Sequence, residues 1–152
     1  MKITKKGEYA LRTLLVLAAN FEQNKIYSLH QIAEQENLPV KFLEQIMTIL
    51  KHAQFVISTK GKHGGYVLSK SPKEITLGEI IRTVDGPLSP FLTAQEIRDR
   101  LKSSAQHAGL YATFLDVRNA IAKILDKKTL ADVVEKSLEL SWSKSTSFVY
   151  EI

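Results

Sequence analysis

The sequence predicts a mainly α-helical protein with one small β-hairpin, an α+β fold. Apolar residues recur at helical spacing along most of the chain, and two β-prone runs flank a glycine-rich stretch near its middle. Gly and Pro are scarce, at 7 and 4 of 152 residues, and 44% of the residues are hydrophobic. A chain of this length buries a core without disulfides, and this one has no cysteine. We therefore expect one folded unit with an appendage.

The segment from Met1 to Phe21 is basic and then apolar, so a signal peptide must be weighed against a structural helix. Glu8 and Arg12 interrupt the apolar run, and no small-residue cleavage site follows it. An amphipathic core helix from about Glu8 to Glu22 explains the segment better. No run approaches the roughly 20 apolar residues that a membrane span needs. We expect a cytoplasmic protein with no membrane partner.

Two short helices separated by a tight turn come next. Ser28 and Gln31 match a capping box, which predicts the start of the first helix. Asn37 to Pro39 forms the turn, and the second helix runs from about Pro39 to Ala53. Its apolar face is predicted to be buried and consists of Leu43, Ile46, Met47 and Leu50.

The opposite face of this second helix is polar. Its side chains are suited to bonding base edges and phosphates, although a solvated face with no partner has the same pattern. The face carries Lys41, Phe42, Glu44, Gln45, Thr48 and Lys51. We expect Gln45 to match adenine and Glu44 the amino group of cytosine, so these two residues are the candidates for sequence discrimination.

A basic hairpin follows the second helix. Phe55 to Thr59 and Tyr66 to Ser69 are β-prone runs joined by KGKHGG, whose glycines permit positive φ angles. Lys60, Lys62 and His63 lie at the predicted tip, within reach of a phosphate backbone or a minor groove. A nucleotide-phosphate loop is the rival interpretation, but neither GxGxxG nor GxxxxGK[ST] is present. Two helices and such a wing are typical of a winged helix-turn-helix.

The positive charge is confined to one half of the chain. Residues 1–75 hold 11 Lys and Arg against 6 Asp and Glu, which leaves +5, whereas residues 76–152 hold 10 of each. A polyanion such as duplex DNA would attract only the first half. A merely soluble basic face is the alternative.

A second helical region lies beyond the hairpin. Thr76 and Glu79 form another capping box, which starts a helix that stops at Asp85 and Gly86. After a polar segment, an apolar stripe recurs at spacings of four and three, as in two helices packed along their length. It consists of Leu110, Phe114, Val117, Ile121 and Ile124. The pattern alone fits a homodimer seam and burial against the chain's own domain equally well.

Several blocks occur together and in order: KGEYALR, FLEQIMTILKHAQFV, KGKHGGYVLSK, ITLGEIIRTVDGPLSP and KILDKKTLADV. They resemble the Rrf-two family of bacterial transcriptional regulators over nearly the whole chain. The resemblance implies a homodimer on a two-fold operator, with the long C-terminal helix at the dimer seam. It implies DNA contacts by Lys41, Phe42, Glu44, Gln45 and Lys60, and we add Lys5 and Ser28 to the predicted set. Phe42 replaces the family's usual tyrosine and Lys60 its usual arginine, so the operator sequence is expected to differ.

Sensing members of that family hold an iron–sulfur cluster with three cysteines, in the part that corresponds to Pro90 to Phe114. This chain has none, and its four histidines show no ligand spacing. We therefore expect no metal and no cofactor, as in the cysteine-free, CymR-like members.

Three parts are expected: a winged helix-turn-helix domain at 1–86, a linker with dimerisation helices at 87–140, and a tail at 141–152. The tail is a Ser-rich linker followed by apolar residues, among them Phe148, Tyr150 and Ile152. The resemblance to CymR-like members implies that these three residues dock into a partner enzyme of the cysteine synthase type. The alternative is that they pack back on the protein or its dimer mate.

The function predicted from these observations is sequence-specific repression of transcription by a homodimer, with a possible link to cysteine or sulfur metabolism. A module that regulates a partner enzyme through its tail is the alternative. An enzyme is not expected, because the chain has no cysteine nucleophile, no G-x-S-x-G, no metal-ligand cluster and no phosphate-loop motif.

Overall fold

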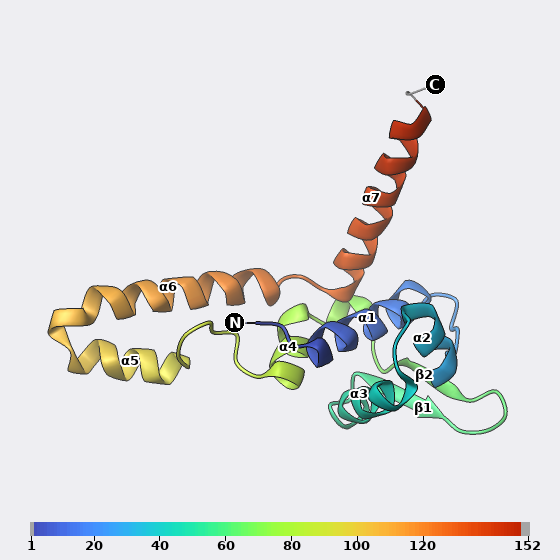
Figure 1. Cartoon of the computed structure of the whole chain (residues 1–152), viewed down its shortest axis with the longest axis horizontal. Coiled ribbons are helices and arrows are strands. Elements are labelled where there is room, and N and C mark those ends of the chain that lie inside the picture. Colours follow the sequence, from blue (N-terminus) through green and yellow to red (C-terminus); the bar gives the residue numbers. More distant parts are fainter. Residues whose placement is uncertain (1, 150–152) are drawn as a thin grey trace.

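The computed structural model describes the backbone of residues 2–149 and the side chains of residues 2–144 (Figure 1). It is mainly helical with one two-stranded antiparallel hairpin, which confirms the predicted fold class. The elements are α1 (Lys5–Ala19), α2 (Leu29–Glu36), α3 (Val40–His52), β1 (Val56–Thr59), β2 (Gly65–Leu68), η1 (Pro72–Glu74), α4 (Leu77–Asp85), α5 (Ala94–Ser103), η2 (Ala105–His107), α6 (Ala108–Leu125) and α7 (Leu130–Val149). None of these helices is long and apolar enough to cross a bilayer.

Helices α1 to α4 and the hairpin enclose one core. Leu14, Leu43, Leu50 and Ile80 are each completely buried in it. Helix α1 was predicted from Glu8 to Glu22 but runs from Lys5 to Ala19. It begins earlier because the Thr4 hydroxyl accepts a hydrogen bond from the Gly7 amide at 3.0 Å and so caps the first turn.

Helix α3 ends in a left-handed turn. The amide of Phe55 donates to the Leu50 carbonyl at 2.9 Å, and the amide of Gln54 donates to the Lys51 carbonyl at 3.0 Å. These are the two bonds of a Schellman motif, and they require a left-handed residue at Gln54, where φ is 61°. The turn directs the chain from α3 into β1.

The hairpin has an antiparallel register in which Val56 pairs with Leu68 and Ser58 with Tyr66. On its far side, β2 is bridged by Tyr27, which exchanges two backbone hydrogen bonds with Tyr66. This approach requires glycine at position 65, since a Cβ there would lie 2.3 Å from the Tyr27 carbonyl oxygen. The hairpin is therefore fixed to the segment between α1 and α2.

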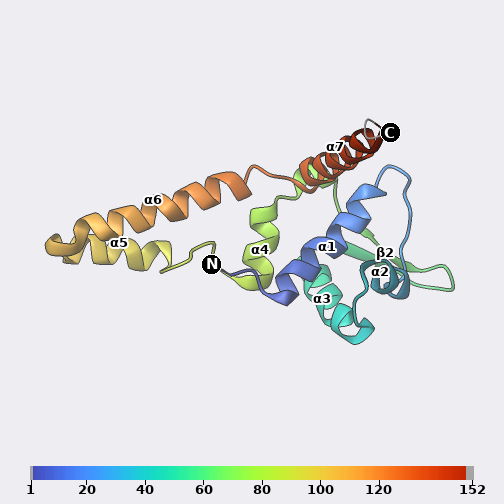
Figure 2. The same cartoon turned by 45° about the horizontal axis from the view of Figure 1, so that its top comes forward.

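Helices α5 and α6 form an arm that extends away from the domain (Figures 1 and 2). The segment expected to be a polar linker is in fact helical, because Thr93 and Glu96 form a capping box that starts α5. Ile97 is completely buried between the two helices, and the rings of Phe91 and Phe114 stack with centroids 4.1 Å apart. No residue of α6 is fully buried.

The junction between α6 and α7 is fastened to α4. The Leu77 amide donates to the Lys128 carbonyl at 2.8 Å, and Arg82 bonds both carboxylate oxygens of Asp126, at 2.6 and 2.9 Å. The carboxylate raises the pKa of Arg82, and the guanidinium lowers the pKa of Asp126. Gly78 makes room, because a Cβ there would meet the Asp126 carboxylate at 2.0 Å.

Helix α7 starts in the core and then leaves it. Leu130 is completely buried, so the start of α7 belongs to the core that α1 to α4 and the hairpin enclose. The Ser-rich segment after Leu140 was expected to be a linker, but the helix continues through it to Val149. The boundary drawn at 140/141 therefore falls inside a helix. The side chain of Phe148 and all of Tyr150 and Ile152 lie outside the described residues.

Candidate nucleic-acid interface

The polar face of α3 is exposed, and its apolar face is buried as predicted. Leu43, Ile46, Met47 and Leu50 have at most 1% of their surface exposed. The exposed side chains lie three and four positions apart and so share one side of the helix. They are Lys41, Glu44, Gln45, Thr48 and Lys51. The Thr48 hydroxyl donates to the Glu44 carbonyl at 2.9 Å, which leaves its oxygen as an acceptor.

Phe42 differs from the rest of the predicted set because it is half-buried. Its ring packs edge-on against Tyr9 of α1, with centroids 5.7 Å apart. Arg12 lies 5.6 Å from the Tyr9 ring centroid, and Lys5 lies 5.7 Å from it. Phe42 therefore holds the first turn of α3 against α1, and only part of its ring is left for a ligand.

Tyr9 and Arg12 are interface-supporting residues that the sequence analysis did not single out. The Arg12 guanidinium bonds the Glu36 carboxylate at 2.9 Å and the Glu36 carbonyl at 2.6 Å. This fixes the end of α2, and with it the turn into α3. Arg12 and Glu36 are 24 residues apart, so no local pattern in the sequence reveals the contact.

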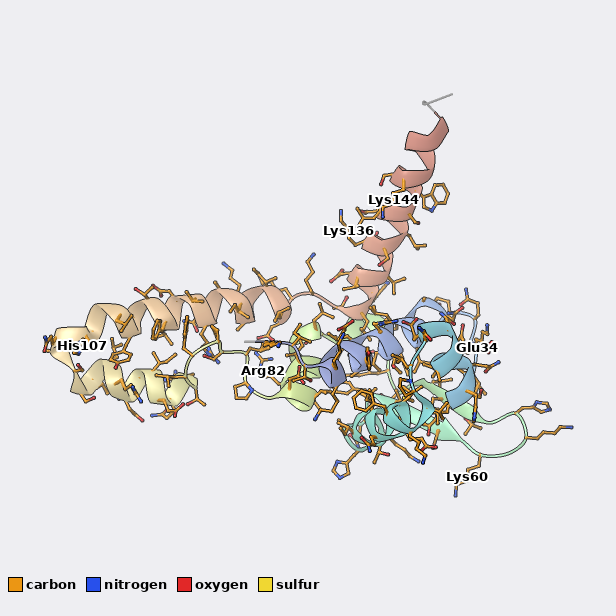
Figure 3. All side chains as sticks on the ribbon, in the orientation of Figure 1. Glu34, Lys60, Arg82, His107, Lys136 and Lys144 are labelled. Carbon is orange, nitrogen blue, oxygen red and sulfur yellow. The ribbon has the colours of Figure 1, made fainter. Side chains whose placement is uncertain are left out.

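The hairpin tip presents three exposed basic side chains: Lys60, Lys62 and His63. Figure 3 shows Lys60 directed away from the body. Gly61 provides the turn with a φ of 113°. In Figure 1 this tip and α3 lie at the lower edge of the domain, whereas α7 rises from the opposite side. The structure thus places the second helix and the wing on one side.

Lys5 and Ser28 lie at the starts of their helices. Lys5 is exposed and sits 3.5 Å from the Glu8 carboxylate. The Ser28 oxygen accepts the Gln31 amide at 3.2 Å, and the capping box is complete because the Ser28 amide donates to the Gln31 side chain at 2.8 Å. The Ser28 hydroxyl proton is therefore available to an acceptor such as phosphate.

The predicted seam lies along α6, far from α3 (Figure 1). Leu110, Val117 and Ile124 are 49%, 38% and 62% exposed, and they repeat every seven residues on the uncovered side. Phe114 and Ile121 are half-buried, and Phe114 is partly covered by Phe91 of its own chain. The five residues thus divide into three exposed and two half-buried positions.

Comparison with known proteins places this geometry in a family. Residues 3–136 match the family model for Rrf2, described as an iron-dependent transcriptional regulator. The chain is 35% identical over 133 residues to the HTH-type transcriptional regulator CymR of Bacillus subtilis, covering 88% of this chain and 89% of that protein. The chain is also similar to the solved structure of CymR, the global cysteine regulator of B. subtilis. The match covers 90% of this chain and 98% of the CymR chain, with a TM-score of 0.72. The match to the structure of T. potens IscR has 30% sequence identity and a TM-score of 0.68, and it covers 90% of this chain and 88% of the IscR chain.

The family's description as iron-dependent does not fit the residues of this chain. Cysteine is absent from the whole sequence. Among the described residues, no three His, Asp or Glu side chains come together as metal ligands do. The segment Ala94–Ser103 is an ordinary capped helix, and we assign no role to iron.

The relatives named above are transcriptional regulators and not enzymes, which confirms the class expected from the sequence. The chain is a DNA-binding regulator with a winged helix-turn-helix, and it belongs to the Rrf2 family.

Proposed function

We propose that this regulator is a cytoplasmic homodimeric repressor that reads a palindromic operator through α3 and the wing. The observation that carries the proposal is the division of α3 into a fully buried apolar face and an exposed face of amide, carboxylate and ammonium groups. Such a helix can enter a major groove without disturbing the core, while Lys60 and Lys62 reach the backbone. Binding of this kind blocks access to a promoter that overlaps the operator.

Homodimer formation is part of the proposal because one recognition helix discriminates poorly. Two helices about one helical turn of DNA apart multiply the discrimination against non-specific sites. The exposed repeat of Leu110, Val117 and Ile124 supports a pairing surface along α6. Because Arg82 and Asp126 fasten α6 to α4, pairing of two arms would hold two recognition helices at a set separation.

The deciding experiment selects duplexes from a random library with the full chain and then measures affinity across salt concentrations. Counterion release predicts that affinity for the selected palindrome falls about a thousandfold or more between roughly 50 and 200 mM salt. Recovery of no preferred sequence, or a salt-independent interaction, would contradict the proposal.

Two substitutions separate base reading from phosphate contact. Gln45→Ala is expected to weaken operator binding by about tenfold and to relax the preference at one base pair. Lys62→Ala is expected to weaken binding to all duplexes equally. It should also reduce the slope of log affinity against log salt concentration by about one. Equal effects of the two variants on every duplex would mean that α3 does not read bases.

A link to cysteine or sulfur metabolism is proposed because the B. subtilis relative is described as the global cysteine regulator. Recovery and sequencing of the DNA that the protein binds in its native cell tests this link. Enrichment upstream of sulfur-assimilation genes is expected. Enrichment elsewhere would restrict the proposal to DNA binding.

The second candidate is regulation of a partner enzyme, such as cysteine synthase, through the C-terminal tail. It is favoured by α7, which projects from the domain with Leu138 and Leu140 more than half exposed. A pull-down from native lysate is expected to recover the enzyme with the full chain and to lose it when Ile152 is deleted. Unchanged recovery after the deletion would rule out docking through the terminus.

A further inference from the structure

Strand β1 has one unpaired edge, and its register shows which groups point there. Tyr66 exchanges backbone hydrogen bonds with Tyr27 at 3.1 and 2.8 Å, so its amide and carbonyl face away from β1. Ser58 stands opposite Tyr66. Opposite residues of an antiparallel pair either bond each other or both turn outward, so the amide and carbonyl of Ser58 face away from β2. Those of Val56, two residues earlier, do the same.

Nothing in the described chain pairs with this edge. Within the described part of the chain, the amides and carbonyls of Val56 and Ser58 form no hydrogen bond. Val56 is only 1% exposed, so the groups of this edge that a partner can reach are those of Ser58. They lie in an open groove of about 1180 Å³, which Glu79, Arg82 and Thr83 of α4 also line. The groove has room for a length of extended chain.

The groove is strongly basic. Lys51, Lys60 and Lys70 line it, and none of them has an ion pair within the described residues. On α4, Arg82 is paired with Asp126, and the Glu79 carboxylate, which accepts the Thr76 amide at 3.0 Å, sets one negative charge against the three lysines. Two copies of this edge would bring like charges together, so pairing of the chain with itself is disfavoured. Acidic side chains are the complement.

We propose that the β1 edge is a docking site for an extended acidic segment of a partner protein, whose backbone pairs with the amide and carbonyl of Ser58. A peptide offers alternating amides and carbonyls and therefore satisfies both kinds of group at the edge. A phosphate backbone offers only acceptors and leaves the carbonyls of the edge without donors. Carboxylates of the segment pair with the three lysines.

Occupation of this edge affects DNA binding. Lys51 and Lys60 line the groove and also belong to the proposed DNA interface. An acidic segment that engages these lysines competes with the operator for them. The partner would thus release the regulator from DNA without a metal or a small-molecule effector.

The test measures fluorescence polarisation of a labelled, amidated peptide of alternating Glu and Val on the full chain without DNA. The same peptide N-methylated at every residue keeps its charge but has no backbone amide left to donate at either edge, so it cannot pair as a strand. The unmodified peptide is expected to bind at least about tenfold tighter than the N-methylated form and to be displaced by operator DNA. A peptide of alternating Lys and Val is expected not to bind.

Substitutions at Ser58 locate the site. Ser58→Pro removes the outward amide, which no ladder bond uses, and is expected to weaken peptide binding by about tenfold. Ser58→Ala keeps the amide and is expected to bind normally. Both variants are expected to retain operator binding. Thermal unfolding checks that the proline variant folds, and the N-methylated peptide decides the question on the unchanged protein if it does not.

Three results would overturn the proposal. Equal binding of the N-methylated and unmodified peptides would mean that attraction between charges alone holds the peptide. Normal peptide binding by Ser58→Pro would place the peptide elsewhere. Absence of peptide binding while duplex DNA binds would mean that the groove serves nucleic acid alone. None of these results bears on the repressor proposal, which rests on α3.

Discussion

The DNA-binding domain and the α5–α6 arm differ in how they bury their apolar residues. In the domain, the apolar faces of α1, α3 and α4 close around one core, and Leu14, Leu43 and Ile80 have no exposed surface. In the arm, only Ile97 is fully buried, and the α6 stripe remains open to solvent. The difference teaches that one chain suffices to bury the apolar faces of the domain, whereas it leaves an apolar stripe of the arm uncovered.

The largest effect is expected from a core substitution that breaks the domain. Leu50→Ala removes a completely buried side chain from α3 and should lower the free energy of unfolding by about 3 kcal/mol. Urea unfolding followed by circular dichroism measures it. Leu140→Ala, on the exposed part of α7, is the matched control and should change stability by less than about 0.5 kcal/mol.

A charge on the open stripe of the arm should separate assembly from folding. Val117→Glu is expected to give folded monomers, with operator affinity reduced roughly a hundredfold, because two recognition helices are no longer linked. Sedimentation velocity gives the oligomeric state. Asn119→Glu places the same charge on an exposed residue of α6 outside the stripe and should leave assembly unchanged. Monomers that still bind the operator tightly would refute the seam.

The domain should become more stable without any change in the arm if Gln54 is replaced by glycine. Gln54 holds the left-handed position of the turn after α3, at φ 61°, where a side chain is strained. Gln54→Gly should therefore stabilise the domain by about 0.5–1 kcal/mol. Chemical unfolding measures the gain, and Gln54→Ala, which keeps a Cβ, should show none.

The smallest effect concerns the ion pair that joins the two regions. Asp126→Asn should cost less than about 1 kcal/mol at neutral pH, because both side chains are more than a third exposed. The pKa of Asp126 is lower in the folded than in the unfolded protein, so the pair stabilises the fold at pH above the ordinary aspartate pKa. The contribution is lost as the pH falls through the lowered folded-state pKa. The variant and the parent should converge in stability there, and a constant difference across this range would contradict the assignment.

Local chemistry made several elements predictable from the sequence. The capping boxes at Ser28 and Thr76 are formed as expected. The apolar period of Leu43 to Leu50 identified the buried face of α3, and the glycine-rich run identified the hairpin. These features depend on residues within a few positions of each other, so a single sequence contains them.

Contacts between distant residues were beyond such reasoning. The packing of Phe42 on Tyr9 and the bonds from Arg12 to Glu36 join separate helices, and they decide how α3 is held. The helix continuing past Leu140 also escaped prediction, because serines are typical of linkers but are tolerated on an exposed helix face.

The sequence by itself determined the family, the basic half of the chain and the helix with a buried apolar face and an exposed polar face, because each depends on residue type and short spacing. Only the tertiary structure decided that α6 leaves an apolar stripe open and that β1 keeps a free edge above a lysine-lined groove. Exposure and strand pairing depend on which elements meet in space, and that is set by packing across the chain rather than by any one segment.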